Sequence, residues 1–68
     1  MIADLANRFT YHPPKGGQAD RYEQIRCRAR QLAEFIDATC PDSREKSLAV
    51  THLEDTVMWA NASIARNE

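Results

Sequence analysis

The chain has 68 residues, of which 43% are hydrophobic, and its nine lysines and arginines nearly balance ten aspartates and glutamates, for a net charge of −1. This length allows one domain, residues 1–68, whose own core supplies no more than about 3–5 kcal/mol of stability, and the composition excludes a disordered chain. No apolar run reaches the roughly 18 residues of a membrane span and no signal segment is evident, so we expect a cytoplasmic protein.

The first residues carry a short apolar pattern that predicts a leading helix over residues 1–8. Ile2, Leu5 and Phe9 would lie on or beside one side of it. The next segment, residues 9–18, is irregular, because it holds two prolines and two glycines. These residues disfavour regular structure, so we expect a loop there.

This loop contains side chains that suit a nucleotide. Pro13 and Pro14 fix their own φ angles and hold His12 extended, so Tyr11 stands on a stiff support. Gly16 and Gly17 allow backbone N–H groups to turn outward beside Lys15. An aromatic face, a cation and free amides together form a simple binding site. The same residues could equally cap the end of the helices that follow, and their types alone leave both interpretations open.

Two long helices are predicted after the loop, over residues 19–40 and 42–67. Each has apolar residues spaced 3, 4, 3, 4: Tyr22, Ile25, Ala29, Leu32 and Ile36 in the first, and Val50, Leu53, Val57, Ala60 and Ile64 in the second. Pro41 ends the first helix, and Asp42 with Glu45 predicts a capping box for the second. A connection this short makes the helices antiparallel, which gives an all-α fold.

The second helix carries more apolar surface than one neighbouring helix can cover. The surplus residues are Leu48, Met58, Trp59 and Ala62, with Phe35 in a similar position on the first helix. Another copy of the chain would cover them in a homo-oligomer, or the leading segment would fold back over them. A disulfide cannot replace such packing, because Cys27 and Cys40 are about 20 Å apart along one helix.

Positive charge is concentrated in the first half of the chain. Residues 1–30 contain six cations and three acids, whereas residues 31–68 contain three cations and seven acids. Such asymmetry can attract a polyanion. Arg26, Arg28 and Arg30 cannot all share one helix face, because positions two residues apart diverge.

Motifs for catalysis are missing from the sequence. His52 and Glu54 form a His-x-Glu pair, but no Pro-Cys-x-x-Cys follows to hold zinc. Cys27 could pair with a histidine as a nucleophile, although a structural cysteine is far more common. The glycine pair matches no phosphate-binding loop. We therefore expect no enzyme, no metal and no cofactor.

Three blocks of the sequence resemble a known family: "RFTYHPP", "QADRY" and "CPDSREKSLAVTHLEDTVMWANASIARN". They are similar to small phage anti-CBASS proteins, whose hairpin domain is shared with an anti-Thoeris group. The resemblance spans nearly the whole chain. It implies a non-enzymatic sponge that sequesters cyclic di- and trinucleotide messengers of the host immune response in the host cytoplasm.

The resemblance also implies where the ligand binds. The expected assembly is a homo-oligomer, a hexamer, with pockets where protomers meet. Tyr11 matches a tyrosine that stacks on a nucleobase. Arg26 matches a phosphate-binding cation, which is a lysine in relatives, and Arg66 is expected to contact phosphate in a second pocket for trinucleotides. Neither a membrane nor DNA is an expected partner.

Two alternatives remain open from the sequence. One is a small oligomeric regulator that presents Arg21, Arg26, Arg28 and Arg30 to nucleic acid, although an isoelectric point of about 6.1 is low for that class. The other is a purely structural oligomerisation module, in which Tyr11 and His12 serve packing.

Overall fold

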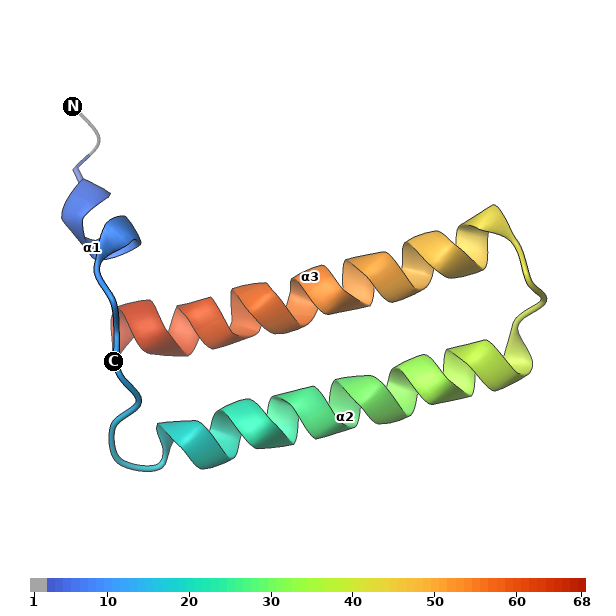
Figure 1. Cartoon of the computed structure of the whole chain (residues 1–68), viewed down its shortest axis with the longest axis horizontal. Helices are drawn as coiled ribbons and strands as arrows, with labels where there is room; N and C mark the ends of the chain where they lie inside the picture. Colours follow the sequence, from blue (N-terminus) through green and yellow to red (C-terminus); the bar gives the residue numbers. More distant parts are fainter. Residues whose placement is uncertain (1–2) are drawn as a thin grey trace.

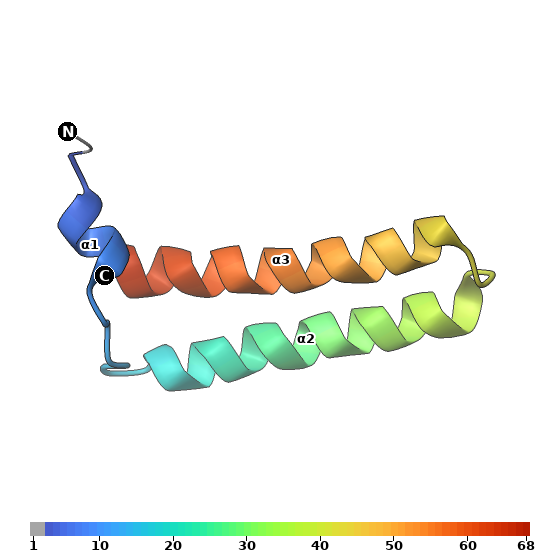
Figure 2. The same cartoon turned by 45° about the horizontal axis from the view of Figure 1, so that its top comes forward.

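The computed structural model describes residues 3–68 and contains three helices in this range: α1 (Leu5–Phe9), α2 (Gln18–Thr39) and α3 (Arg44–Asn67) (Figure 1). The helices α2 and α3 lie side by side and run antiparallel, and α1 stands at an angle beside the end of α3 (Figure 2). The described chain is therefore all-helical, and the predicted hairpin is present. None of its helices is long and apolar enough to cross a membrane.

The helix ends differ from the predicted ones by a few residues. The first helix begins at Leu5, and Ile2, predicted on its apolar side, lies outside the described residues. The second begins at Gln18 and ends at Thr39. Cys40 has extended backbone, φ −97° and ψ 141°, because a residue that precedes a proline is held out of the helical region. Pro41 thus stops α2, as predicted.

The N-terminal cap of α3 is Ser43, so the predicted capping box of Asp42 and Glu45 is wrong. The hydroxyl of Ser43 accepts a hydrogen bond of 3.1 Å from the backbone N–H of Lys46. Serine and aspartate are both good caps, so residue type could not place the cap. Asp42 is instead occupied by the Lys46 side chain, at 2.8 Å.

We expect Ser43→Ala to lower the free energy of unfolding by about 0.5–2 kcal/mol, because it leaves the N–H of Lys46 without its acceptor. Urea unfolding followed by circular dichroism measures this loss. Ser47→Ala is the matched control, since it removes a serine from the first turns of α3 that does not cap the helix. Equal stability of the two variants would contradict the assignment of Ser43.

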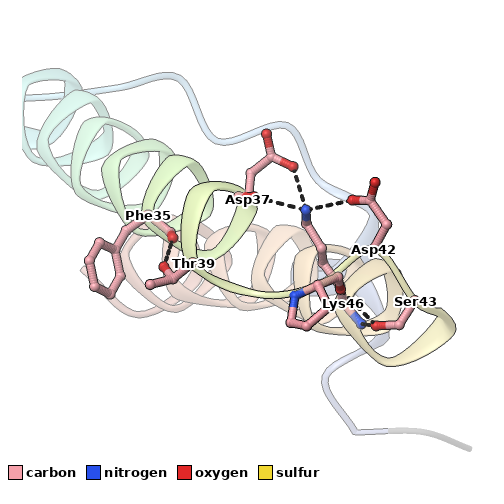
Figure 3. Close-up of polar contacts among 7 residues, drawn as sticks. Phe35, Asp37, Thr39, Asp42, Ser43 and Lys46 are labelled. Carbon is pink, nitrogen blue, oxygen red and sulfur yellow. Dashed lines mark hydrogen bonds and ion pairs between the residues drawn. The ribbon is translucent and has the colours of Figure 1, made fainter.

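The turn between α2 and α3 is held by the ammonium group of Lys46 (Figure 3). It lies 2.9 Å from Asp37 Oδ1 and 2.8 Å from Asp42 Oδ1, and it donates to the Asp37 carbonyl at 2.8 Å. Only 11% of its side chain is exposed. Lys46 therefore links the last turn of α2 to the start of α3, and the pKa of Asp42 is lowered by its hydrogen bond to this lysine.

Contact between α2 and α3 is made by half-buried apolar side chains. The α3 residues are those predicted: Val50, Leu53, Val57, Ala60 and Ile64. On α2, Ala33 takes the place expected for Leu32, whose side chain is 49% exposed. A helix of 3.6 residues per turn drifts away from a strict 3, 4, 3, 4 pattern, and this moves Leu32 to the edge of the contact.

The hairpin has no enclosed core in its described part. The molecule measures 44 × 32 × 12 Å, so it is one helix thick, and no hydrophobic residue among residues 3–68 is fully buried. Met58 is exposed and Trp59 is 68% exposed. The suggestion that the leading segment folds back over these side chains is wrong, because α1 leaves them open and is itself exposed at Phe9.

Candidate functional site

An open hollow lies where the loop of residues 10–17 passes the end of α3. Its volume is about 270 Å³, and it is lined by Tyr11, His12, Pro13, Pro14, Lys15, Gln18, Ala65 and Glu68. We refer to it as the Tyr11 hollow. Three of the predicted site residues, Tyr11, His12 and Lys15, meet here, together with two polar residues that the sequence did not single out.

Hydrogen bonds fix the loop that carries these side chains. The ring Nε2 of His12 donates to the carbonyl of Asn7, at 3.0 Å. The N–H of Lys15 donates to the Gln18 side chain, at 3.1 Å, and Gly16 turns the chain into α2 with a φ of +57°, which favours glycine. His12 therefore holds the loop against α1, and its Nε2 is engaged in this contact. The backbone N–H of Lys15 is engaged in the same way by Gln18.

Tyr11 is the most open of the lining side chains that could stack on a base. Its side chain is 80% exposed, while the adjacent prolines limit the backbone that carries it. Because most of the ring is open to solvent, packing within this chain does not explain why a large aromatic residue lies here. The ring of Tyr11 is therefore accessible from solvent in this chain.

Three polar side chains meet at the edge of the hollow beside the start of α2. Gln18 and Glu68 line the Tyr11 hollow, whereas Arg21 lines a neighbouring one of about 210 Å³. Gln18, which is only 4% exposed, donates from Nε2 to Glu68 Oε1 at 3.3 Å. Arg21 binds both oxygens of the same carboxylate, with 2.8 Å from Nη1 to Oε2. Because Gln18 also accepts from Lys15, this cluster ties the loop, α2 and the end of α3 together.

The pKa of Glu68 is lowered to about 2, first by its hydrogen bond with Arg21, then by that from Gln18. The charges of Arg21 and Lys15 lower it further. The carboxylate therefore stays ionised at any physiological pH. Its stabilising effect is fully present above its unfolded pKa of about 4.5 and is lost as the pH falls toward 2.

We expect the melting temperature of the wild type to fall between pH 4.5 and pH 2, and Glu68→Gln to remove part of this fall, because the glutamine cannot titrate. Circular dichroism melts at several pH values across this window measure both curves. Glu45→Gln is the control, since it makes the same substitution at a glutamate that has no ion pair within residues 3–68. Parallel curves for the wild type and Glu68→Gln would refute this role of Glu68.

Arg26 does not reach the Tyr11 hollow of its own chain. It lines a separate hollow of about 180 Å³ between α2 and α3, together with Ala29, Arg30, Ala33, Val50, Leu53 and Glu54. Its guanidinium lies 2.9 Å from Glu23 Oε2. Within one chain, Tyr11 and Arg26 therefore line different hollows.

Arg66 is near the hollow through its backbone only. Its carbonyl accepts a hydrogen bond from Asn7 Nδ2 at 3.3 Å, which holds α1 against the end of α3. Its side chain lies in the exposed last turn of α3 and does not line the Tyr11 hollow. The structure thus separates Arg66 from the other predicted site residues.

Three of the arginines on α2 are already paired with glutamates. Arg21 pairs with Glu68, Arg26 with Glu23, and Arg30 with Glu34 at 3.0 Å. These pairs neutralise much of the positive face that a nucleic-acid regulator would present. The sequence alone had suggested such a face.

Sequence reasoning missed Gln18, Arg21 as a partner of Glu68, and Glu68 itself. The signal that could have found them is the antiparallel hairpin, because it places the first residues of α2 opposite the last residues of α3. Within residues 3–68, no group of three or more histidine, cysteine, aspartate or glutamate side chains could hold a metal ion. Cys27 and Cys40 are both free and exposed.

Comparison with protein families matches residues 1–65 to the hairpin domain of Acb2/Tad1. The match includes the loop with Tyr11 and nearly all of both long helices, so the resemblance stated from the sequence is confirmed. No curated protein and no solved structure matches the chain. Glu68 lies outside the matched residues.

Proposed function

This chain belongs to the Acb2/Tad1 hairpin-domain family, which is the family of anti-CBASS and anti-Thoeris sponges, and from that premise we propose that it binds cyclic di- and trinucleotides. It sequesters these immune messengers in the cytoplasm of the host cell. Binding alone lowers the free messenger concentration, so the function needs no catalysis, metal or cofactor. Its inhibition of host signalling is stoichiometric and reversible.

The observation that carries this proposal is the exposed ring of Tyr11 above a hollow. A base can stack on a ring that is 80% exposed and held by two prolines. Lys15 supplies a cation on the same hollow, and a cyclic dinucleotide carries two phosphates. Aromatic surface and positive charge thus lie within reach of one ligand.

The proposed active form is a homo-oligomer, a hexamer as expected from the resemblance. Tyr11 and Arg26 line separate hollows in one chain, so a pocket between two copies would unite the tyrosine of one with the arginine of the other. A cyclic dinucleotide has approximate two-fold symmetry. A two-fold interface offers the same pair of residues to each half of such a ligand. Arg66 remains a proposed contact for trinucleotides in a second pocket.

Native mass spectrometry with a panel of cyclic di- and trinucleotides tests this proposal. The proposal requires an oligomer that retains cyclic dinucleotides in a fixed ratio and releases them unchanged. A linear dinucleotide of the same bases is the control for nonspecific binding. A protein that retains no cyclic nucleotide, or that returns a hydrolysed product, would refute the proposed function.

A further inference from the structure

Arg21 and Glu68 form an ion pair at the edge of the Tyr11 hollow. The carboxylate of Glu68 lines the hollow, and Arg21 holds it from the side of α2 with both terminal nitrogens. Both side chains are partly open to solvent, 46% and 41% exposed. A ligand in solution can therefore reach both side chains.

An arginine that binds a carboxylate in this way is also suited to a phosphate. The planar guanidinium presents parallel N–H groups, and both anions offer two oxygens at matching spacing. Lys15 lies on the same hollow and contributes to the field that keeps Glu68 ionised. The hollow therefore already binds an anion, and that anion is a side chain of the chain itself.

We propose that Arg21, at the edge of the Tyr11 hollow, is a phosphate-binding residue and that Glu68 is an internal anion, which the phosphate of a bound ligand displaces from it. This inference rests on the proposed function, since it assumes that a cyclic nucleotide enters the hollow. Because the phosphate must displace Glu68 from Arg21, Glu68 lowers the affinity of the protein for its ligand. Gln18, almost fully buried and bonded to Lys15, keeps the loop in place when Glu68 leaves.

A purely structural role of the Arg21–Glu68 ion pair leads to a different expected result from competition with phosphate. If Arg21 and Glu68 only tied the loop to α3, loss of either residue would loosen the hollow, and both substitutions would weaken binding. If Glu68 competes with phosphate, loss of the acid strengthens binding and loss of the arginine weakens it. The signs of the two effects therefore decide between the roles.

The experiment is calorimetry with cyclic di-AMP and cyclic di-GMP on the wild type, Glu68→Gln, Arg21→Gln and the double variant. We expect Glu68→Gln to bind about two- to fivefold more tightly, the range of an exposed ion pair. Arg21→Gln should bind about tenfold or more weakly, because it loses a charged hydrogen bond. In the double variant the gain from Glu68→Gln should disappear, because Arg21 is no longer there to be released.

Glu45→Gln controls for the change in net charge, since Glu45 lies in the first turn of α3, away from the hollow. The inference is overturned if Glu68→Gln binds no more tightly than the wild type, or if its gain persists without Arg21 or appears equally in Glu45→Gln. A wild type that binds neither of these nucleotides, nor any other cyclic nucleotide of the panel, overturns it together with the proposed function. Wild-type binding without a gain in Glu68→Gln overturns the role of Glu68 alone.

Discussion

Replacing Tyr11 with alanine should weaken the binding of cyclic di-AMP by roughly 2–6 kcal/mol, about thirtyfold at the least. One aromatic platform is worth about 1–3 kcal/mol per base, and a pocket shared by two copies loses two platforms. The ring is exposed in the free chain, so its loss removes no packing within residues 3–68. Calorimetry on the wild type and the variant measures the difference.

Tyr11→Phe is the matched control for this change. It keeps the aromatic face and removes only a hydroxyl that makes no hydrogen bond within the described chain. We expect it to bind nearly as well as the wild type, and circular dichroism should show the same helix content in all three proteins. If Tyr11→Ala keeps wild-type affinity, Tyr11 only caps the open end of the hairpin and the ligand binds elsewhere.

Trp59→Ala should dissociate the proposed oligomer and lower its stability by about 3–5 kcal/mol per buried ring. Trp59 lies on the side of α3 turned away from α2, because it is two residues beyond Val57 in the contact. Leu48 is three turns earlier on the same side and is also exposed. A chain one helix thick leaves such surface for another copy to cover.

Light scattering at micromolar concentration should show a multimer for the wild type and a smaller species for Trp59→Ala. Phe9→Ala is the comparison, since it removes an exposed aromatic from α1 and leaves the outer side of α3 intact. A wild type that is a stable, folded monomer would contradict self-association altogether. An equal decrease in the mass of the assembly in both variants would show that the contact between copies is not specific to α3.

The sequence predicted the hairpin well because its signals are local and strong. Pro41 must stop a helix, and the apolar spacing from Val50 to Ile64 survives in the structure without change. Leu32 was misplaced because a helix has 3.6 residues per turn and so drifts away from a strict 3, 4, 3, 4 repeat. The cap was misplaced because Asp42 and Ser43 both suit that role, and the side chain of Lys46, which occupies Asp42, decides between them.

The site was predicted only in part, for reasons of distance. Tyr11, His12 and Lys15 are close in the sequence, so one loop brings them to one hollow. Arg26 lies about two turns after the start of α2, and the helix does not bend back toward the loop. Arg21 and Glu68 are 47 positions apart, and only the packed hairpin makes them neighbours.

The short connection at residues 40–43 has a consequence for the speed of folding. Most contacts of this chain lie within one helix or across that connection, and proteins with such local contacts fold in microseconds to milliseconds. Encounters between copies are slower and depend on concentration. If the proposed oligomer is the binding form, newly made protein would gain binding capacity more steeply than in proportion to its amount.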